Sequence, residues 1–312
     1  MTGGQPGVSA SSPPAPVTVA WPQPLVPVIV LGRLNRFAVA ALPEAEVPDR
    51  AAAPVPPAGG TGAPAASEAV GGRDGADRDR PLRLHLPNSG RMAELLAPGT
   101  RGLARLAAGD RHRRTAGELL LVAYRGRWVS VDARMPNRLF LAALRARALP
   151  PFAAYRRWQA EVPWGRGRLD FRLEDADPPA PPCLVETKSC NLVEGGTALF
   201  PDAPTARGSR HLDAMAAAVR QGWRAAVVWF VQRDDAVRLA PHSTADPAFA
   251  AALARARAAG VEAYAYRCRV TPAAIAVLDA IPVLTAPVVQ GDPSPSVSPG
   301  AAMRSERRSS LR

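Results

Sequence analysis

The sequence predicts an α/β protein in which a mixed sheet is flanked by helices. Helical and strand patterns alternate between residues 205 and 270, and two segments with the period-2 alternation of strands come before them, at 169–173 and 184–188. Buried strands that alternate with helices are typical of a sheet with helices on its faces. This alternation predicts the fold class. The composition of the flanking segments indicates which residues belong to the folded part.

Three stretches at 1–27, 48–81 and 287–312 are rich in Pro, Ala, Gly and Ser and hold few side chains that could build a core. The chain has 34 Pro and 25 Gly residues, and they cluster in these stretches. Such composition predicts disorder, because little apolar surface offsets the entropy of ordering. About 225 residues remain, which suffice for two modest cores.

The secondary structure of the remaining chain follows from caps and periodicity. Leu169, Phe171 and Leu173 alternate with polar residues, as in a strand with one buried face. Gly222 and Gly260 mark the ends of two helices, and Asp246 is a cap residue at the start of the second one. In chain order we expect a helix at 135–149, strands around 169–173 and 184–188, a helix at 205–222, a strand at 225–232, a helix at 246–260 and a strand at 261–270.

Several classes of protein are excluded. The longest apolar runs have seven residues, far fewer than a membrane span requires, and no secretory signal pattern opens the chain. Cys183, Cys190 and Cys268 have no C-x-x-C spacing, so we expect neither a disulfide framework nor a cysteine zinc site, and we expect a cytoplasmic location. Glycine-rich phosphate loops and the H-E-x-x-H and G-x-S-x-G motifs are absent from the sequence.

The net charge of +12 is concentrated in one region. Residues 81–172 hold 18 Arg and 6 acidic residues, whereas residues 1–80 carry a net charge of −1 and residues 173–312 a net charge of +1. Such a field attracts a polyanion, and nucleic acid binding is strengthened by counterion release. The alternative is a basic surface that binds no ligand, in which the codon bias of a GC-rich genome accounts for the many arginines. We expect the arginines 111, 113, 114, 134, 138, 145, 147, 156 and 157 to form this field.

Lys188 is the only lysine among 39 basic residues. Arginine is a planar fork that stays charged, whereas lysine is a compact ammonium that can stand beside a metal-bound water. A single lysine in so arginine-rich a chain therefore points to a site where the guanidinium would not fit. Chance retention is the alternative.

Acidic residues surround this lysine in the predicted strands. Glu186 shares a strand face with Lys188, and a turn-connected pair of strands would bring Asp170 beside Glu186. Carboxylates and an ammonium in mid-strand are costly to bury unless they bind something. The pattern D-x15-E-x-K suits a Mg²⁺ or Mn²⁺ site for phosphodiester cleavage, with Asp170, Glu186 and the Thr187 carbonyl as ligands and Lys188 orienting the attacking water. Glu161 is a candidate further ligand; the alternative is a surface ion pair between Glu186 and Lys188.

Several blocks of the sequence resemble the sugar fermentation stimulation protein A family. They include LGRLNRF at 31–37, LHLPNSGRM at 84–92, NRL at 137–139, EVPWGRGRLDF at 161–171, LVETKSCNL at 184–192 and FPDAPTARGSRHL at 200–212. The resemblance covers about 28–285 and is interrupted by the Pro/Ala-rich insert. It implies an N-terminal OB-like β-barrel followed by a PD-(D/E)XK nuclease-like domain. It also implies DNA binding without marked sequence preference and a role in the regulation of sugar (maltose) metabolism.

The resemblance also assigns roles to single residues. Asp170, Glu186 and Lys188 match the nuclease-type motif, Glu161 matches the acidic position ahead of it, and Arg168 matches an arginine suited to a phosphate contact. Other candidates for nucleic acid binding are Arg91, Arg138, Arg207, Arg210 and His211. For Arg91 the alternative is a tight turn without a ligand, and for His211 it is helix packing.

The expected organisation has four parts: a disordered tail at 1–24, an OB-like domain at 25–130 with its insert at 48–81, a nuclease-like domain at 131–286, and a disordered tail at 287–312. The expected partner is DNA or RNA, bound through its phosphates, and the expected cofactor is Mg²⁺ or Mn²⁺. Two functions stay open: a DNA-binding regulator that keeps the acidic site without cleaving, and an active metal-dependent nuclease.

Overall fold

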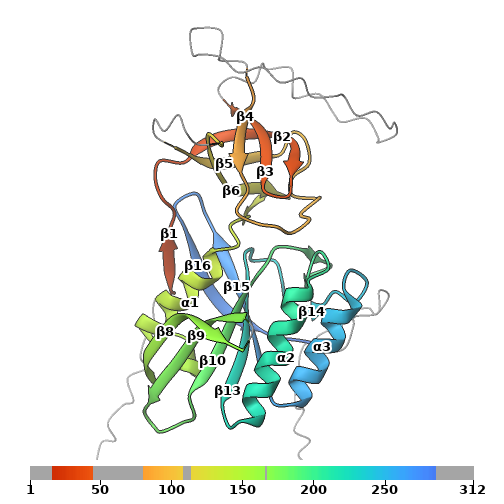
Figure 1. Ribbon diagram of the computed structural model, residues 1–312. Coiled ribbons are helices and arrows are strands. Elements are labelled where there is room, and N and C mark those ends of the chain that lie inside the picture. Colours follow the sequence, from red (N-terminus) through yellow and green to blue (C-terminus); the bar gives the residue numbers. More distant parts are fainter. Residues whose placement is uncertain (1–15, 45–79, 108–113, 166, 286–312) are drawn as a thin grey trace, which may run out of the picture.

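The structure is a computed structural model that describes residues 16–44, 80–107, 114–165 and 167–285. The low-complexity stretches 1–15, 48–79 and 287–312 and the arginines 111 and 113 lie outside these residues. The described chain forms a small β-barrel on top of a larger sheet with helices (Figure 1). No helix in the described residues is long and apolar enough to cross a membrane.

Five strands of the N-terminal part close into a barrel. They run in the order β4-β3-β2-β5-β6, and the parallel pairing of β4 with β6 closes the ring. The interior is apolar and includes Val30, Leu84 and Leu119, none of which is exposed. The five strands are β2 (Val26–Asn35), β3 (Ala38–Pro43), β4 (Leu82–His85), β5 (Arg101–Leu106) and β6 (Gly117–Tyr124).

A hairpin leads from the barrel to the C-terminal part. The strand β7 (Arg127–Ser130) pairs with β6, and the helix α1 (Met135–Ala146) begins a few residues later. The sequence predicts a longer helix, to residue 149, but Arg147 takes a left-handed conformation with φ of 51° and caps α1 there. The short 3₁₀ turn Pro150–Phe152 follows.

The C-terminal part is built on a seven-stranded mixed sheet in the order β1-β16-β15-β13-β10-β9-β8. The pairs β10–β13 and β13–β15 are parallel and the other pairs are antiparallel, which confirms the predicted mixed sheet. Its strands are β1 (Thr18–Ala20), β8 (Tyr155–Trp164), β9 (Gly167–Ala176), β10 (Cys183–Cys190), β13 (Arg224–Val231), β15 (Glu262–Val270) and β16 (Ala274–Ile281).

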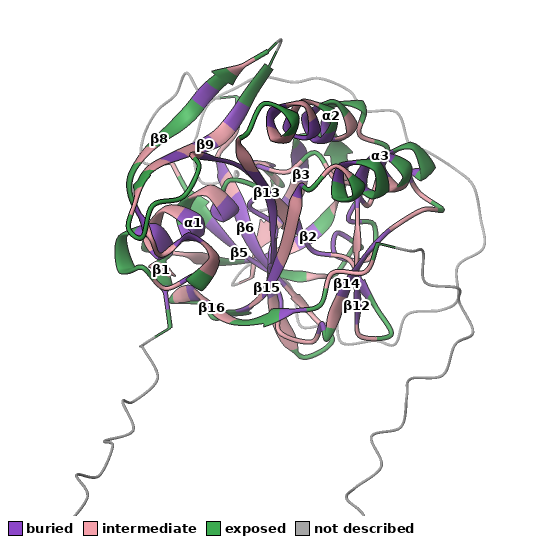
Figure 2. Cartoon of the chain, turned by 90° about the horizontal axis from the view of Figure 1, so that it is seen from below, coloured by how far each residue is buried: buried purple, intermediate pink, exposed green. Residues whose placement is uncertain are grey.

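Helices cover both faces of this sheet. The helix α1 packs on one face with Val228 and Phe230 of β13, while α2 (Ala206–Arg220) and α3 (Pro247–Ala258) pack on the other face with Val227 and Trp229. Figure 2 shows α1 on the opposite side of β13 from α2 and α3. Because β13 is buried on both faces, its sequence is apolar almost throughout, as in the interior strands of parallel sheets.

Two features differ from the sequence-based expectation. Residues 18–20, placed in a disordered tail by their Pro-rich surroundings, form the edge strand β1, because they pair with β16 and because Trp21 is buried and donates from Nε1 to the Thr271 carbonyl at 2.9 Å. A small sheet, which the sequence does not predict, is formed by β11 (Val193–Glu194), β12 (Thr197–Phe200) and β14 (Arg238–Pro241).

Candidate metal and nucleic-acid site

The site begins where the strands β9 and β10 part. Their ladder ends at the pair Phe171–Val185, so Asp170 and the residues after Val185 are no longer joined through their backbones. The side chain of Asp170 takes over: its Oδ2 accepts the backbone N–H of Thr187 at 2.7 Å. A carboxylate that replaces a ladder hydrogen bond is held in the plane of the sheet, in the gap between the two strands.

Asp170 is anchored from the α1 face of the sheet. Asn137, in the first turn of α1, donates from Nδ2 to Asp170 Oδ1 at 3.1 Å. The Thr187 hydroxyl lies 2.9 Å from Asp170 Oδ2 and 2.7 Å from Asn137 Oδ1. Burial raises the pKa of Asp170, and the nearby charge of Glu186 raises it further, against the opposing hydrogen bond from Thr187.

Glu186 and Lys188 lie on the α2 face. Oε1 of Glu186 is 2.5 Å from Lys188 Nζ and 2.5 Å from His211 Nδ1, which comes from α2. Burial alone would raise the pKa of Glu186, but Lys188 and His211 outweigh it and lower the pKa. Glu186 Oε2 is buried and has no hydrogen-bond partner among the described residues. One carboxylate oxygen is thus held in place, while the other has no hydrogen-bond partner in the described part of the chain. An unpaired oxygen on a buried charge costs free energy.

A cavity of about 490 Å³ opens over these residues and is shared by the two parts of the chain. Asn137, Asp170, Glu186 and Lys188 line it from the C-terminal part, and Arg36 and Asn88 line it from the barrel. A substrate in this cavity would therefore contact both parts.

The barrel loop at this cavity is held by Asp202, which follows β12. Asp202 Oδ2 accepts the backbone N–H of Met92 at 3.2 Å. Gly90 lies so close that a Cβ added there would be 2.5 Å from Asp202 Oδ2. The turn at residues 88–90 is therefore a packed contact between the two parts of the chain. A side chain larger than that of glycine at position 90 would clash with Asp202.

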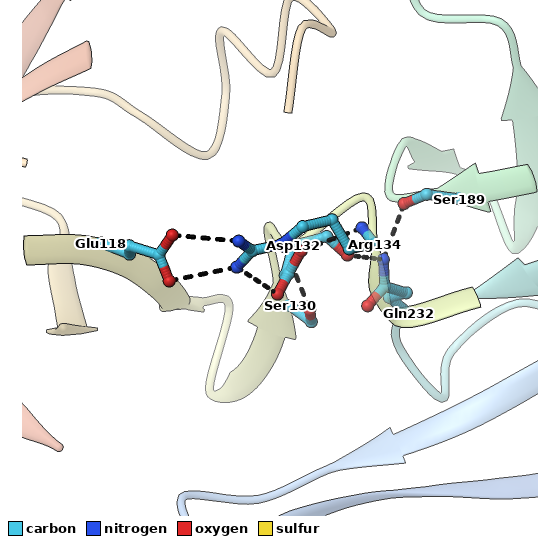
Figure 3. A network of polar contacts seen from close by, with 6 residues as sticks. All are labelled: Glu118, Ser130, Asp132, Arg134, Ser189 and Gln232. Carbon is cyan, nitrogen blue, oxygen red and sulfur yellow. Dashed lines mark hydrogen bonds and ion pairs between the residues drawn. The ribbon is translucent and has the colours of Figure 1, made fainter. Parts of the chain in front are cut away.

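A polar network joins the barrel to the C-terminal sheet (Figure 3). Gln232, after β13, donates from Nε2 to the Asp132 carbonyl at 2.9 Å and to Ser189 Oγ at 2.7 Å. Arg134 contacts both Glu118 of β6, at 3.0 Å, and Asp132, at 2.8 Å. Because most of this network is buried or half-buried, it holds the barrel at one position relative to β10.

This network corrects part of the predicted basic field. Asp132 and Glu118 neutralise Arg134, and their hydrogen bonds raise its pKa, that of Asp132 most strongly. Arg156 forms an ion pair with Asp177, and Arg157 lies 4.0 Å from Asp175. These three arginines are therefore less available to a polyanion than the net charge of the sequence suggests, because each has an acidic partner in the folded chain.

Two of the predicted site residues lie apart from the carboxylates. Glu161 is 60 % exposed and pairs with Arg168 at 3.1 Å, so the structure does not bring it into the cluster as a further ligand. Arg168 instead lines a second cavity, of about 450 Å³, together with Trp164, Arg207, Arg210 and His211. Because Arg207 lines both cavities and His211 contacts Glu186, the second cavity adjoins the first.

Two further candidates lie outside the first cavity, and a neighbour of one of them, which sequence reasoning missed, lines it. Arg138 and Arg91 are exposed and do not line it. Asn137, next to Arg138 in the same matching block, is the residue of that pair that contacts Asp170. The helical pattern gave no means of choosing between these neighbours, since that choice depends on the rotation of α1 against β9.

The donor set fits a magnesium-type ion. No group of three or more His, Cys, Asp or Glu side chains in the described ranges is arranged to hold a metal. Mg²⁺, however, is usually bound by one or two carboxylates and keeps several of its waters. Two adjacent carboxylates supply that set, and one of them has a buried oxygen without a partner among the residues that the structure describes. The Thr187 carbonyl lies on the same strand edge as the N–H that Asp170 accepts, and it would offer a further hard oxygen to such an ion.

Comparisons with known proteins agree with this architecture. The family model described as "Sugar fermentation stimulation protein RE domain" matches residues 134–274, and the model described as "SfsA N-terminal OB domain" matches residues 68–131. The second match, together with the closed five-stranded barrel, confirms the predicted OB-like domain.

Similar proteins match over most of their own length. A sugar fermentation stimulation protein homolog of Moorella thermoacetica is 48 % identical over 197 residues, which are 63 % of this chain and 84 % of that protein. A homolog of Chloroflexus aurantiacus is 46 % identical over 207 residues, or 65 % of this chain and 77 % of that protein. A solved structure, of Pyrococcus furiosus SfsA in complex with Ca²⁺, matches with a TM-score of 0.67 and 26 % identity, and the match covers 84 % of this chain and 97 % of that one.

Proposed function

Because this chain belongs to the sugar fermentation stimulation protein family, we propose that it binds nucleic acid through the phosphate backbone and cleaves it at a divalent-cation site. Asp170 and Glu186 are the proposed metal ligands, with the Thr187 carbonyl as a third. The observation that carries the proposal is the buried Oε2 of Glu186, which has no hydrogen-bond partner in the described part of the chain and lies beside Asp170 at a cavity shared by both parts of the chain.

The cavity favours an anionic substrate. Arg36 and Arg207 line it from opposite parts of the chain, and the region 81–172 carries a net charge of +12. Guanidinium groups bind phosphate oxygens well, and contacts to the backbone need no particular base sequence. A bound cation, Mg²⁺ or Mn²⁺, would lower the pKa of a water and stabilise the charge that develops on the phosphate.

Each side chain of the site has a defined task in this proposal. Asn137 and the Thr187 N–H keep the Asp170 carboxylate in the gap between the strands. Lys188 and His211 hold Oε1 of Glu186 and leave Oε2 turned to the ligand. Lys188 also lines the cavity, so its ammonium is placed to orient a water or to offset negative charge on the substrate. The Ca²⁺ complex of the Pyrococcus relative supports a divalent cation in this fold.

A second function, a regulator of sugar metabolism that binds DNA without cleaving it, is favoured by a different observation. Both oxygens of Asp170 already accept hydrogen bonds within the protein, from Asn137 and Thr187. A carboxylate satisfied in this way is a weaker metal ligand than a free one. Under this alternative the acidic cluster serves structure, and nucleic acid binding is its only activity. The three free, buried cysteines fit a reducing cytoplasm under either function.

One experiment separates the two functions. The wild-type protein, Asp170→Ala and Lys188→Arg are incubated with single- and double-stranded DNA and with RNA, in the presence of Mg²⁺ or Mn²⁺. Cleavage by the wild type that both variants lose supports the nuclease. Binding by all three proteins without cleavage supports the regulator.

Two controls make this assay specific. Glu161→Gln removes an exposed carboxylate that lies outside the cluster, so it should cleave like the wild type. Binding should weaken steeply between low and physiological salt, because phosphate contacts release counterions. Affinity that does not change with salt would contradict backbone recognition.

A further inference from the structure

The tip of the β2–β3 hairpin exposes large apolar side chains. Leu34 is 52 % exposed and Phe37 is 50 % exposed, and Leu31 on the same hairpin is 38 % exposed. Only two other large apolar residues in the described ranges are exposed, Leu106 and Val237. Three of these five residues thus lie on one hairpin.

The hairpin tip is held rigidly by Arg33. Its guanidinium donates to four backbone carbonyls: those of Asn35 at 3.1 Å and Arg36 at 2.7 Å in the tip itself, and those of Gly90 and Arg91 at 2.6 Å each in the neighbouring loop. The Asn35 side chain adds a turn contact, since its Oδ1 accepts the N–H of Phe37 at 2.9 Å. An exposed apolar tip that is fixed by so many bonds is pre-organised, which lowers the entropy lost when a ligand binds.

The tip adjoins the cavity of the candidate site. The Arg36 guanidinium lies 5.7 Å from the centre of the Phe37 ring, and Arg36 is also one of the residues that line the cavity with Asp170 and Glu186. Phe37 is therefore one side chain away from the cavity wall. A ligand that reaches the two carboxylates from this side passes over an aromatic ring and a guanidinium.

We propose that Phe37 and Arg36 form a stacking platform for an unpaired base of single-stranded nucleic acid that enters the site; this rests on the proposed function. An exposed ring beside a guanidinium suits a nucleobase next to its phosphate, because the base stacks on the ring and the phosphate meets the charge. In a duplex both faces of each base are already stacked within the helix. The platform would therefore favour single strands over duplexes. Contacts to phosphates alone discriminate less, because both kinds of nucleic acid have phosphates.

The surroundings favour this occupant over an apolar protein segment. Arg36 is part of the platform and Arg33 donates to its carbonyl, and Arg36 also lines the cavity that holds the candidate metal site. A protein partner held by apolar contact would need neither the adjoining cavity nor the guanidinium against the ring. In barrels of the OB type, moreover, the first inter-strand loop takes part in binding oligonucleotides.

The test is equilibrium binding with chelator present, so that no cleavage occurs. Fluorescently labelled oligothymidylate and a hairpin duplex with the same number of phosphates are titrated with wild type, Phe37→Ala and Phe37→Trp. Leu106→Ala is the matched control, because Leu106 is an exposed apolar residue of the same barrel, 37 % exposed, that does not line the cavity. Circular dichroism confirms that each variant is folded.

We expect Phe37→Ala to bind the single strand about 5- to 150-fold more weakly, the range of one lost base–aromatic stack. Its affinity for the duplex should stay within about twofold of the wild type, Phe37→Trp should bind the single strand like the wild type, and Leu106→Ala should change neither affinity. An equal loss on both ligands, or no loss on either, would overturn the platform while leaving backbone binding in place. If the wild type binds neither ligand, the proposed function itself fails.

Discussion

His211 Nδ1 lies 2.5 Å from Glu186 Oε1, although the two residues are 25 positions apart in the chain. The contact exists because α2 packs across the face of β10 that carries Glu186. Arg207, one turn earlier, lies with Nε 3.4 Å from His211 Nε2. A guanidinium can only donate, so Nε2 accepts and the proton on Nδ1 is directed at Glu186. The histidine thus orients the carboxylate from behind.

Replacing His211 should weaken metal binding. In His211→Ala, Glu186 keeps only Lys188 on Oε1 and is free to turn, so we expect the dissociation constant for Ca²⁺ or Mn²⁺ to rise about 10- to 100-fold, as is usual when a residue that supports a metal ligand is lost. Isothermal titration calorimetry measures this directly. His242→Ala, a change at a histidine outside the cluster, is the control and should bind as the wild type does. An unchanged constant in His211→Ala would mean that Lys188 alone positions Glu186.

The contact of Gly90 with Asp202 should appear as an energetic coupling. A Cβ at residue 90 displaces the Asp202 carboxylate from the Met92 N–H, so Gly90→Ala should cost about 1–2 kcal/mol in the free energy of unfolding. In the Asp202→Ala background the same substitution should cost little, because the obstructing atoms are gone. Urea denaturation of the four proteins measures the coupling. Gly167→Ala is the control, since its nearest atoms are 3.9 Å away; equal costs in both backgrounds would contradict the contact.

Substitution of Arg33 should loosen the hairpin tip and the neighbouring loop, although the residue lies near the surface. Arg33→Lys keeps the charge but replaces a planar fork by a single ammonium, which cannot reach four carbonyls at once. We expect amide hydrogen exchange in 34–37 and 88–92 to become faster, with little change in the β13 strand. Mass spectrometry after proteolysis measures the exchange. Arg101→Lys, a change at a mostly exposed arginine of β5, should leave both segments as they are.

One ion pair should contribute stability that depends on pH. Burial works to raise the pKa of Glu262, but the hydrogen bonds from Arg224, at 2.7 and 2.8 Å, and from Tyr264 outweigh it and lower the pKa below the ordinary 4.5. A lowered pKa in the folded state means that the pair stabilises the protein above pH 4.5 and that this contribution is lost as the pH falls through the folded value.

Glu262→Gln tests this contribution. The variant should lose about 1–2 kcal/mol of unfolding free energy at pH 7, and the difference from the wild type should shrink as the pH drops below the unfolded pKa. Urea denaturation across this pH range measures both values. The control is Glu44→Gln, whose partner Arg101 is 63 % exposed, so that the loss should be much smaller. If the difference in unfolding free energy between the wild type and Glu262→Gln did not change with pH, the charge of the Glu262 carboxylate would not be the source of the stabilisation.

Much of the secondary structure could be predicted because its signals are local. Asp246 caps α3 as expected and accepts the N–H of Phe249, three positions later, at 2.9 Å. Thr205 caps α2 in the same way and accepts the N–H of Gly208 at 3.1 Å. The alternation around Phe171 predicts β9, and the single lysine drew attention to the strand that holds Glu186. Caps and alternation act within a few residues, so they can be read without knowing how the elements pack.

Only the tertiary structure decided which side chains meet at the site. Asn137 and Arg36 reach the first cavity from α1 and a barrel hairpin, and His211 reaches Glu186 from α2. The rotation and offset of those elements depend on packing between residues far apart in the chain. The fold also left Glu161 exposed beside Arg168 and brought Glu118 of the barrel to Arg134. The amino-acid sequence determined the elements and the pair of carboxylates near one lysine; the assembled sheet determined their partners, because contact between distant residues is a property of the whole fold.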